Sequence, residues 1–156
     1  MRGKQAKSRE IKPDKVYHSQ LVNRVVNKLM QHGKKTIAER IVYTSLENLS
    51  KETKAKPVDF LEKAVKNVTP DVEVRSRRIG GANYQIPTPV TERRQVSLAV
   101  RWIVDAARSR KGTDITTALS TELRDAYNNT GSAAKKKEDV HRMAEANKAF
   151  SHFAMR

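Results

Sequence analysis

A pair of adjacent glycines, Gly80 and Gly81, constrains the fold of this chain more than any other feature of its sequence. The pair separates two runs of residues that favour extended backbone. Such a pair is typical of a two-residue hairpin turn, because both glycines can adopt positive φ angles. We therefore predict an antiparallel β-ribbon with strands at 72–79 and 82–88, in which Ile79 lies opposite Ala82.

Arginines and apolar residues are interleaved on both faces of this ribbon. Alternation places the side chains in two sets, which are Arg75, Arg77, Ile79, Ala82, Tyr84 and Ile86 on one face and Val74, Ser76, Arg78, Asn83, Gln85 and Pro87 on the other. Two strands alone are only marginally stable, so we expect the ribbon to project from a packed body and to become fully ordered against a partner. Three arginines near the turn favour a polyanionic partner, although an edge hairpin with solvated charges gives the same pattern.

Apolar residues recur at helical spacing before the ribbon and predict three helices there. The first begins after Ser19, whose hydroxyl can cap it, and stops at Gly33. The second opens with Thr36 in capping-box spacing with Glu39. The third starts at Pro57 and ends before residue 70.

Three further helices are predicted after the ribbon. Thr91 caps the fourth, which runs to about Arg110, and the fifth covers 114–128. Ser132 caps the sixth, which runs to about Phe150. The predicted fold is mainly α: a bundle of about six helices with one projecting two-stranded β-ribbon between the third and fourth helices.

The 156 residues are predicted to form a single domain. Its parts are an extended basic arm at 1–18, a helical body at 19–70 and 91–150, the ribbon at 71–89 and a tail at 151–156. The arm contains few apolar residues, so we expect it to be disordered alone and ordered on RNA. A terminus that merely increases solubility would have the same composition.

The fourth helix joins the core to a line of cations. Arg94, Arg101 and Arg108 recur every seven residues on the side opposite its apolar face. Asp105 lies among them and is expected to pair with Arg101 or Arg108.

The charge of the chain indicates the class of its partner. The formal net charge is +15, from 32 Lys and Arg against 17 Asp and Glu, which favours binding to phosphate backbones or anionic surfaces. No apolar run approaches the roughly 18 residues of a membrane-spanning helix, so a membrane is not the expected partner. The absence of cysteine excludes disulfides and thiolate metal sites and fits a reducing compartment.

The sequence lacks the motifs of an enzyme. The four histidines are scattered, and no phosphate loop, nucleophile elbow or metal-ligand spacing is present. We therefore predict no catalytic activity, no cofactor and no metal site.

Two classes of nucleic-acid binder remain. Aromatic residues make up only 5% of the chain, which disfavours a protein that stacks many bases of a single strand. Recognition of folded RNA through shape and phosphates fits better. The alternative is a nucleoid-type architectural DNA-binding protein with a β-arm, which would favour an apolar wedge at the tip of the ribbon.

Four stretches, at 70–87, 32–43, 98–112 and 135–153, resemble small-subunit ribosomal protein seven of the bacterial type. The resemblance extends over nearly the whole chain. It implies a structural constituent of the small ribosomal subunit, a primary 16S rRNA-binding protein that organises the 3′ major domain and nucleates assembly of the head. It also implies a cytoplasmic protein, although plastid relatives share the pattern.

The same resemblance implies partners and site residues. The ribbon would lie near the exit-site tRNA and the mRNA path, and ribosomal proteins nine and eleven would be neighbours. Arg75, Arg77 and Arg78 would contact RNA from the ribbon, with Gly80 and Gly81 shaping its tip. The phosphate contacts of the body would be Arg2, Lys4, Lys34, Lys35, Arg94, Arg101, Arg108, Lys111, Lys136 and Arg142.

Overall fold

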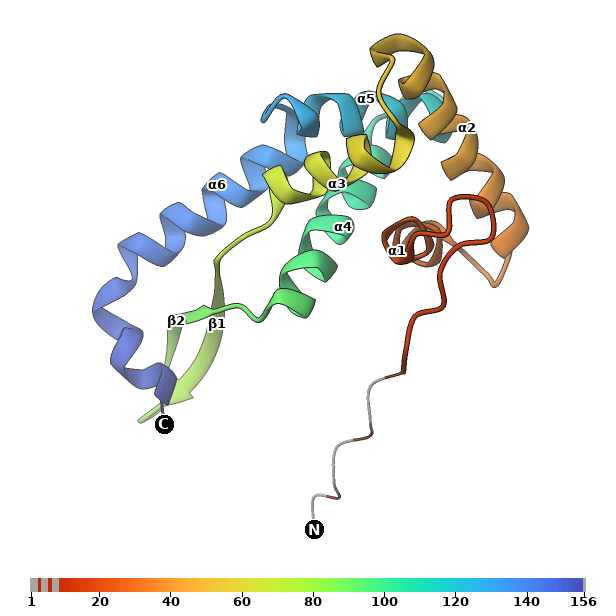
Figure 1. Cartoon of the computed structure of the whole chain (residues 1–156). Coiled ribbons are helices and arrows are strands. Elements are labelled where there is room, and N and C mark those ends of the chain that lie inside the picture. Colours follow the sequence, from red (N-terminus) through yellow and green to blue (C-terminus); the bar gives the residue numbers. More distant parts are fainter. Residues whose placement is uncertain (1–2, 4–5, 7–8, 156) are drawn as a thin grey trace.

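The computed structural model describes residues 3, 6 and 9–155, and it is mainly helical, as predicted (Figure 1). A two-stranded antiparallel ribbon stands between the third and fourth helices, which confirms the predicted fold class. In chain order the elements are α1 (Gln20–Leu29), α2 (Lys35–Thr53), α3 (Pro57–Val68), β1 (Val72–Ile79), β2 (Ala82–Pro89), α4 (Glu92–Ser109), α5 (Ile115–Tyr127), α6 (Gly131–Ala146) and a 3₁₀ helix, η1 (Lys148–Met155).

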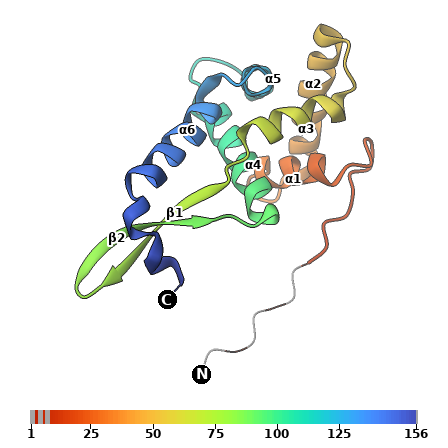
Figure 2. The same ribbon diagram turned by 60° about the vertical axis from the view of Figure 1, so that its left-hand side comes forward.

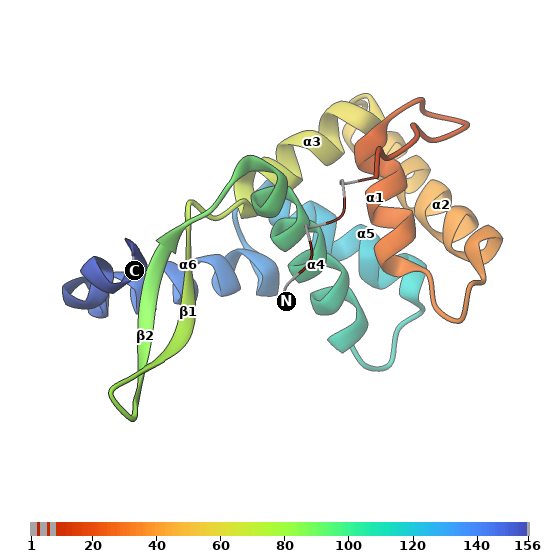
Figure 3. The same cartoon turned by 90° about the horizontal axis from the view of Figure 1, so that it is seen from below.

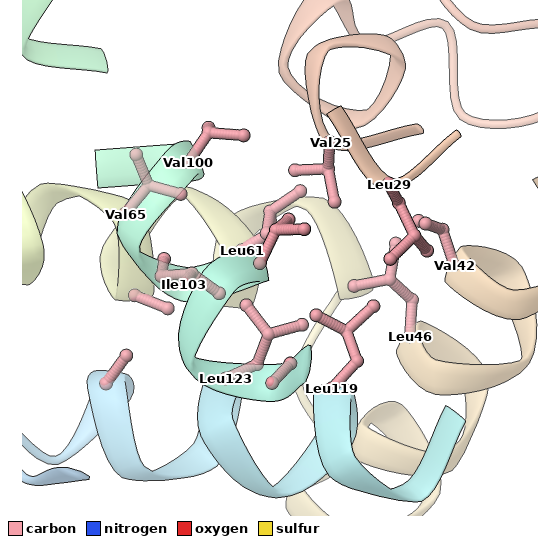
Figure 4. Close-up of a cluster of buried hydrophobic side chains, with 14 of the residues drawn as sticks. Val25, Leu29, Val42, Leu46, Leu61, Val65, Val100, Ile103, Leu119 and Leu123 are labelled. Atoms are coloured by element: carbon pink, nitrogen blue, oxygen red, sulfur yellow. The ribbon is translucent and has the colours of Figure 1, made fainter. Parts of the chain in front are cut away.

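The hydrophobic core is formed by the apolar faces of the helices, with α4 and α5 at its centre (Figure 4). Ile103 of α4 and Leu119 and Leu123 of α5 are almost completely buried. Leu46 of α2 and Leu61 of α3 are buried in the same cluster. The periodic apolar positions therefore face one common interior, and the charged positions are left for the surface.

Two predicted helix starts are confirmed in atomic detail. The Ser19 hydroxyl accepts hydrogen bonds from the backbone amides of Leu21 and Val22, at 3.2 and 3.5 Å. Pro57 occupies the first turn of α3, where its missing amide hydrogen costs nothing. These starts could be predicted because the cap and its acceptor lie within a few residues of each other.

The predicted cap of the second helix is wrong. α2 begins at Lys35, one residue before Thr36, and no side chain caps it. Gly33 has a φ angle of +73°, and its carbonyl accepts the Lys35 amide at 2.8 Å. This tight turn brings the chain into helical geometry before Thr36 is reached.

Both predicted ends of the sixth helix are also wrong. α6 begins at Gly131 rather than after Ser132, and the amide of Ala133 donates to the Glu122 carboxylate of α5 at 2.9 Å. The helix ends at Ala146, and the Asn147 side-chain amide donates to the Met143 carbonyl at 2.8 Å. The chain then continues as η1 and not as a separate tail from residue 151.

The start of α6 is attached to the core by a buried ionic group. Glu122 is completely buried, and its second carboxylate oxygen accepts two hydrogen bonds from Arg110, at 2.8 and 3.2 Å. The same guanidinium donates to Asp125 at 2.6 Å. α4, α5 and α6 therefore meet at one carboxylate whose hydrogen-bonding capacity is used within the protein.

The ribbon has the predicted register, with Ile79 opposite Ala82 and positive φ angles at Gly80 and Gly81. The end of the ribbon farthest from the turn, its base, packs against the rest of the protein. Ile86 is completely buried, and the ribbon packs against both α6 and η1. Figure 2 shows the turn extending past the C-terminal segment, and Figure 3 shows the ribbon leaving the helical body. The projection is therefore limited to the half of the ribbon nearest the turn.

Gly131 should be the glycine least tolerant of substitution at the start of α6. It has a φ angle of +86°, and an added Cβ would lie 2.7 Å from the Cβ of Asp125. We expect Gly131→Ala to lower the free energy of unfolding by about 3 kcal/mol, from left-handed backbone strain together with overpacking. Urea denaturation followed by circular dichroism measures the loss.

Gly112→Ala is the matched control. Gly112 has a similar φ angle of +79°, but no atom lies within 4 Å of its added Cβ. It should lose only the backbone contribution of about 1 kcal/mol. Equal losses in the two variants would show that the contact with Asp125 has no energetic weight.

Candidate nucleic-acid interface

The described residues offer neither a membrane span nor a metal centre. None of their helices is long and apolar enough to cross a bilayer. No group of three potential metal-ligating side chains occurs among them.

A groove between the N-terminal segment, α1 and α4 is lined mainly by cations. It consists of two adjoining depressions that share Ile11, Arg24 and Arg93. We call this surface the basic groove. Its cations are Arg9, Lys12, Arg24, Lys28, Arg93 and Arg101, and the only carboxylate among its lining residues is Glu10. A groove with this charge is suited to an extended polyanion.

One wall of the basic groove is held in place by a buried aspartate. One oxygen of Asp14 accepts the amides of Val16 and Tyr17, at 3.0 and 3.1 Å, and the other accepts the Tyr43 hydroxyl at 2.7 Å. The side-chain amide of Asn23 donates to the carbonyl of Lys12 at 2.6 Å. The segment predicted as an extended arm is thus attached to α1 and α2 from Lys12 onward.

These contacts determine the protonation states of Asp14 and Tyr43. Burial acts to raise the pKa of Asp14, but the hydrogen bonds from Tyr43 and from the backbone amides outweigh it and lower that pKa. Burial and the same hydrogen bond raise the pKa of Tyr43. At neutral pH the pair is therefore a phenol donating to a carboxylate.

The three arginines of α4 have different surroundings and do not form one continuous stripe. Arg101 is exposed and lines the basic groove. Arg94 donates to Glu73 of β1 at 3.2 Å. Asp105 pairs with Lys28 of α1 at 3.7 Å, so the prediction that it pairs with Arg101 or Arg108 is wrong. The packing of α1 against α4 brings Lys28 to that carboxylate.

Arg108 binds the end of α1. Its guanidinium donates to the carbonyls of Leu29 and Lys28, at 3.0 and 3.4 Å, where the helix leaves carbonyls without intrahelical partners. It also lines a third depression, separate from the basic groove, together with His32, Lys34 and Arg110. Arg108 thus has a structural partner as well as access to the surface.

The arginines of the ribbon also differ in their surroundings, and some of them bind partners within the protein. Arg75 and Arg94 both bind the buried carboxylate of Glu73, with the Arg75 Nε at 2.6 Å. Arg77 donates to the Phe153 carbonyl of η1 at 3.5 Å. Arg78 is exposed. Glu73 therefore connects the ribbon to α4 through two of the predicted RNA-binding residues.

An aromatic cluster connects the ribbon to the C-terminal segment. The Tyr84 ring lies 5.2 Å from that of Phe150 and 5.8 Å from that of Phe153. Both spacings fall within the range of favourable aromatic contacts. One face of the ribbon is consequently covered by η1.

The other predicted site residues are spread over the surface. Lys34 precedes α2, and Lys35 pairs with Glu39 at 3.8 Å. Lys111 and Lys136 are exposed, and Arg142 is exposed with Asp139 at 3.9 Å. Gly80 and Gly81 form the turn of the ribbon, and Arg2 and Lys4 lie outside the described residues.

Of the six cations of the basic groove, the sequence analysis selected only Arg101 as a site residue, and Arg24 and Arg93 are the missed cations that line both depressions. Arg24 falls on the polar face of α1, and Arg93 precedes the arginine that was selected from the seven-residue spacing. Their polar-face positions were a signal, but only the packing of α1 beside α4 brings them to one groove.

Comparison with known proteins identifies the family. The family model described as ribosomal protein S7p/S5e matches residues 1–148. The chain belongs to this family. It is 56% identical to the small ribosomal subunit protein uS7 of Petrotoga mobilis over 153 residues, which cover 98% of this chain and 99% of that protein. It is 58% identical to the uS7 protein of Dictyoglomus thermophilum over 145 residues, 93% of each chain.

Membership of the S7p/S5e family bears on two predictions. It confirms the resemblance to small-subunit ribosomal protein seven, because the match extends over nearly the full length of the relatives. It also confirms that the chain is a structural protein and not an enzyme, because the family consists of ribosomal proteins.

Protonation of Asp14 at acidic pH should weaken the attachment of the N-terminal segment to α1 and α2. The folded-state pKa of Asp14 lies below its ordinary value of 3.8, so its stabilising contribution is present above that value and is lost as the pH falls through the folded pKa. We expect the free energy of unfolding to fall more steeply below about pH 4 in the wild type than in Asp14→Asn. Urea denaturation at a series of pH values measures both slopes, and parallel curves would contradict the assignment.

Arg108 and Arg101 form a matched pair on one helix. Arg108→Ala should lower the free energy of unfolding by about 1 kcal/mol, because it removes a cation from the C-terminus of α1. Arg101→Ala should change it by less than about 0.5 kcal/mol, because no hydrogen bond or ion pair of its side chain occurs among the described residues. Thermal denaturation compares them, and an equal loss would refute the capping role.

Proposed function

We propose that the chain is a structural constituent of the small ribosomal subunit that binds 16S rRNA and organises its 3′ major domain, which nucleates assembly of the head. The basic groove is the observation that carries this proposal, since six cations and one carboxylate line it, and only Lys28 among these cations pairs with a further carboxylate of the described residues, that of Asp105. Multiple phosphate contacts supply essentially all of the non-specific affinity and a large share of the specific affinity of a nucleic-acid-binding protein. The names of the uS7 relatives point to the small subunit as the assembly in which these contacts are made.

The whole chain, residues 1–156, acts in this proposal as one RNA-binding domain. Arg24, Arg93 and Arg101 hold phosphates in the basic groove, Lys34 and Arg108 extend the contact toward the start of α2, and the exposed Lys111 adds a further phosphate contact. Arg2, Lys4, Lys35, Lys136 and Arg142 add phosphate contacts at the periphery. The ribbon and its base add RNA contacts through Arg75, Arg77, Arg78 and Arg94. Gly80 and Gly81 shape the turn of the ribbon.

The ribbon reaches toward the exit-site tRNA and the mRNA path in the same proposal. Ribosomal proteins nine and eleven are neighbours, and the protein is located in the ribosome of the cytoplasm. Support for the placement of the ribbon comes from its exposed outer half, which is available to a partner outside the helical body.

Binding of purified protein to the rRNA junction of the 3′ major domain tests the proposal against an architectural DNA-binding role. A duplex DNA of equal length is the competitor, and filter binding is measured at two salt concentrations. Junction binding should be tighter by several kcal/mol at the higher salt, as for a specific site. Equal and steeply salt-dependent binding to both would favour the DNA-binding alternative.

The basic groove should account for part of the salt dependence. The double variant Arg24→Ala, Arg93→Ala should reduce the slope of log K against log salt by about two, because each lost phosphate contact removes about one. Lys51→Ala, Lys56→Ala removes the same charge from exposed positions at the far end of α2 and before α3, and should leave the slope unchanged. Equal effects of both variants would exclude the groove as the specific site.

A further inference from the structure

The two faces of the ribbon have unequal access to a partner. One face is used internally, because Glu73 binds Arg75 and Arg94, Tyr84 packs on η1 and Ile86 is buried. The strand register places Val74, Ser76, Arg78, Asn83, Gln85 and Pro87 on the opposite face. A ligand can reach the outer half of that opposite face without displacing these contacts.

Two prolines show how the strands are paired on this opposite face. Pro87 lies opposite Val74, and Pro89 lies opposite Val72. Proline has no amide hydrogen, so these pairs occupy positions that exchange no inter-strand hydrogen bonds. The same alternation makes Ser76–Gln85 and Arg78–Asn83 pairs of this kind, in which facing side chains lie closest together.

These two pairs form an exposed polar patch near the turn. We define the amide face as Ser76, Arg78, Asn83 and Gln85. All four are exposed, and none of their side chains makes a hydrogen bond or ion pair within the described part of the chain. Their donors and acceptors are therefore available to a ligand.

We propose that the amide face reads the edges of unpaired purines in single-stranded RNA. This inference rests on the proposed RNA-binding function and assigns base recognition to one set of residues. Asn and Gln side chains can bond an adenine through its N6 and N7 atoms, and Arg can bond a guanine through O6 and N7. In single-stranded RNA these edges are not enclosed in the narrow major groove of a duplex.

The composition of the patch favours bases over phosphates. It carries one cation beside two amides and a hydroxyl, whereas the basic groove carries six cations. An amide both donates and accepts, which matches a base edge, whereas a phosphate can only accept. Successive pairs on one face lie about 7 Å apart along the ribbon, so Asn83 and Gln85 can reach different nucleotides.

The amide face contains no aromatic side chain, so base recognition here depends on hydrogen bonds. Tyr84 is on the other face and packs against Phe150. Removal of one hydrogen-bonding atom from the base should therefore weaken binding more than it would in a stacking site.

The test uses the full chain and three RNA oligonucleotides of equal length, made of adenine, 7-deazaadenine or uracil. The 7-deaza base keeps the charge and stacking surface of adenine but lacks the N7 acceptor. The wild type should bind the adenine oligonucleotide about tenfold tighter than either of the others. In Asn83→Ala, Gln85→Ala the three affinities should become equal within about twofold, with the salt dependence unchanged.

Arg24→Ala, Arg93→Ala is the control, and it should weaken all three complexes by one factor while keeping the tenfold preference. Circular dichroism confirms that the exposed substitutions leave the fold intact. Equal wild-type affinity for the three oligonucleotides, or a preference that survives the Asn83 and Gln85 substitutions, would overturn the assignment of the amide face. Failure to prefer the rRNA junction over duplex DNA is a separate result, and it would instead refute the proposed function.

Discussion

The buried carboxylate of Glu122 is the contact on which the arrangement of the C-terminal half depends. A charged group removed from water is costly unless its hydrogen-bonding capacity is used, and Glu122 uses it on Arg110 and on the Ala133 amide. The hydrogen bond with Glu122 in turn raises the pKa of Arg110. Because the buried residues of α6 are only alanines and Val140, its small apolar face fixes the helix less firmly than large side chains would. The ionic contact at its start therefore orients α6.

The direction of α6 determines what happens to the ribbon. The helix leads into η1, whose aromatic rings pack on Tyr84, and the base of the ribbon is bound to α4 through Glu73. A two-stranded ribbon that would be marginal alone thus gains a covered face and a fixed base. Its opposite face remains available near the turn. One face of the ribbon therefore packs against the rest of the protein, and the other face is free to contact a ligand near the turn.

Buried carboxylates also explain how a chain with a net charge of +15 remains compact while exposing its cations. Asp14, Glu73 and Glu122 are all buried and bind partners within the protein. Asp14 holds the segment that borders the basic groove, Glu73 holds the ribbon, and Glu122 holds α6. Glu73 pairs with Arg75 and Arg94, and Glu122 pairs with Arg110, whereas Asp14 binds Tyr43 and backbone amides. No carboxylate lines the depression that Arg24, Arg93 and Arg101 share.

The sequence by itself determined the elements whose cause is local. Helical periodicity located the six α-helices, Ser19 and Pro57 marked two of their starts, and Gly80–Gly81 set the turn and register of the ribbon. Only the tertiary structure decided where α6 begins, which arginines bind partners within the protein and which residues line the basic groove. Arg94 and Glu73 are 21 positions apart, and the Ala133 amide is 11 positions from Glu122. The physical reason is distance along the chain: a cap or turn depends on neighbours within a few residues, whereas the partner of a charge depends on how whole helices pack.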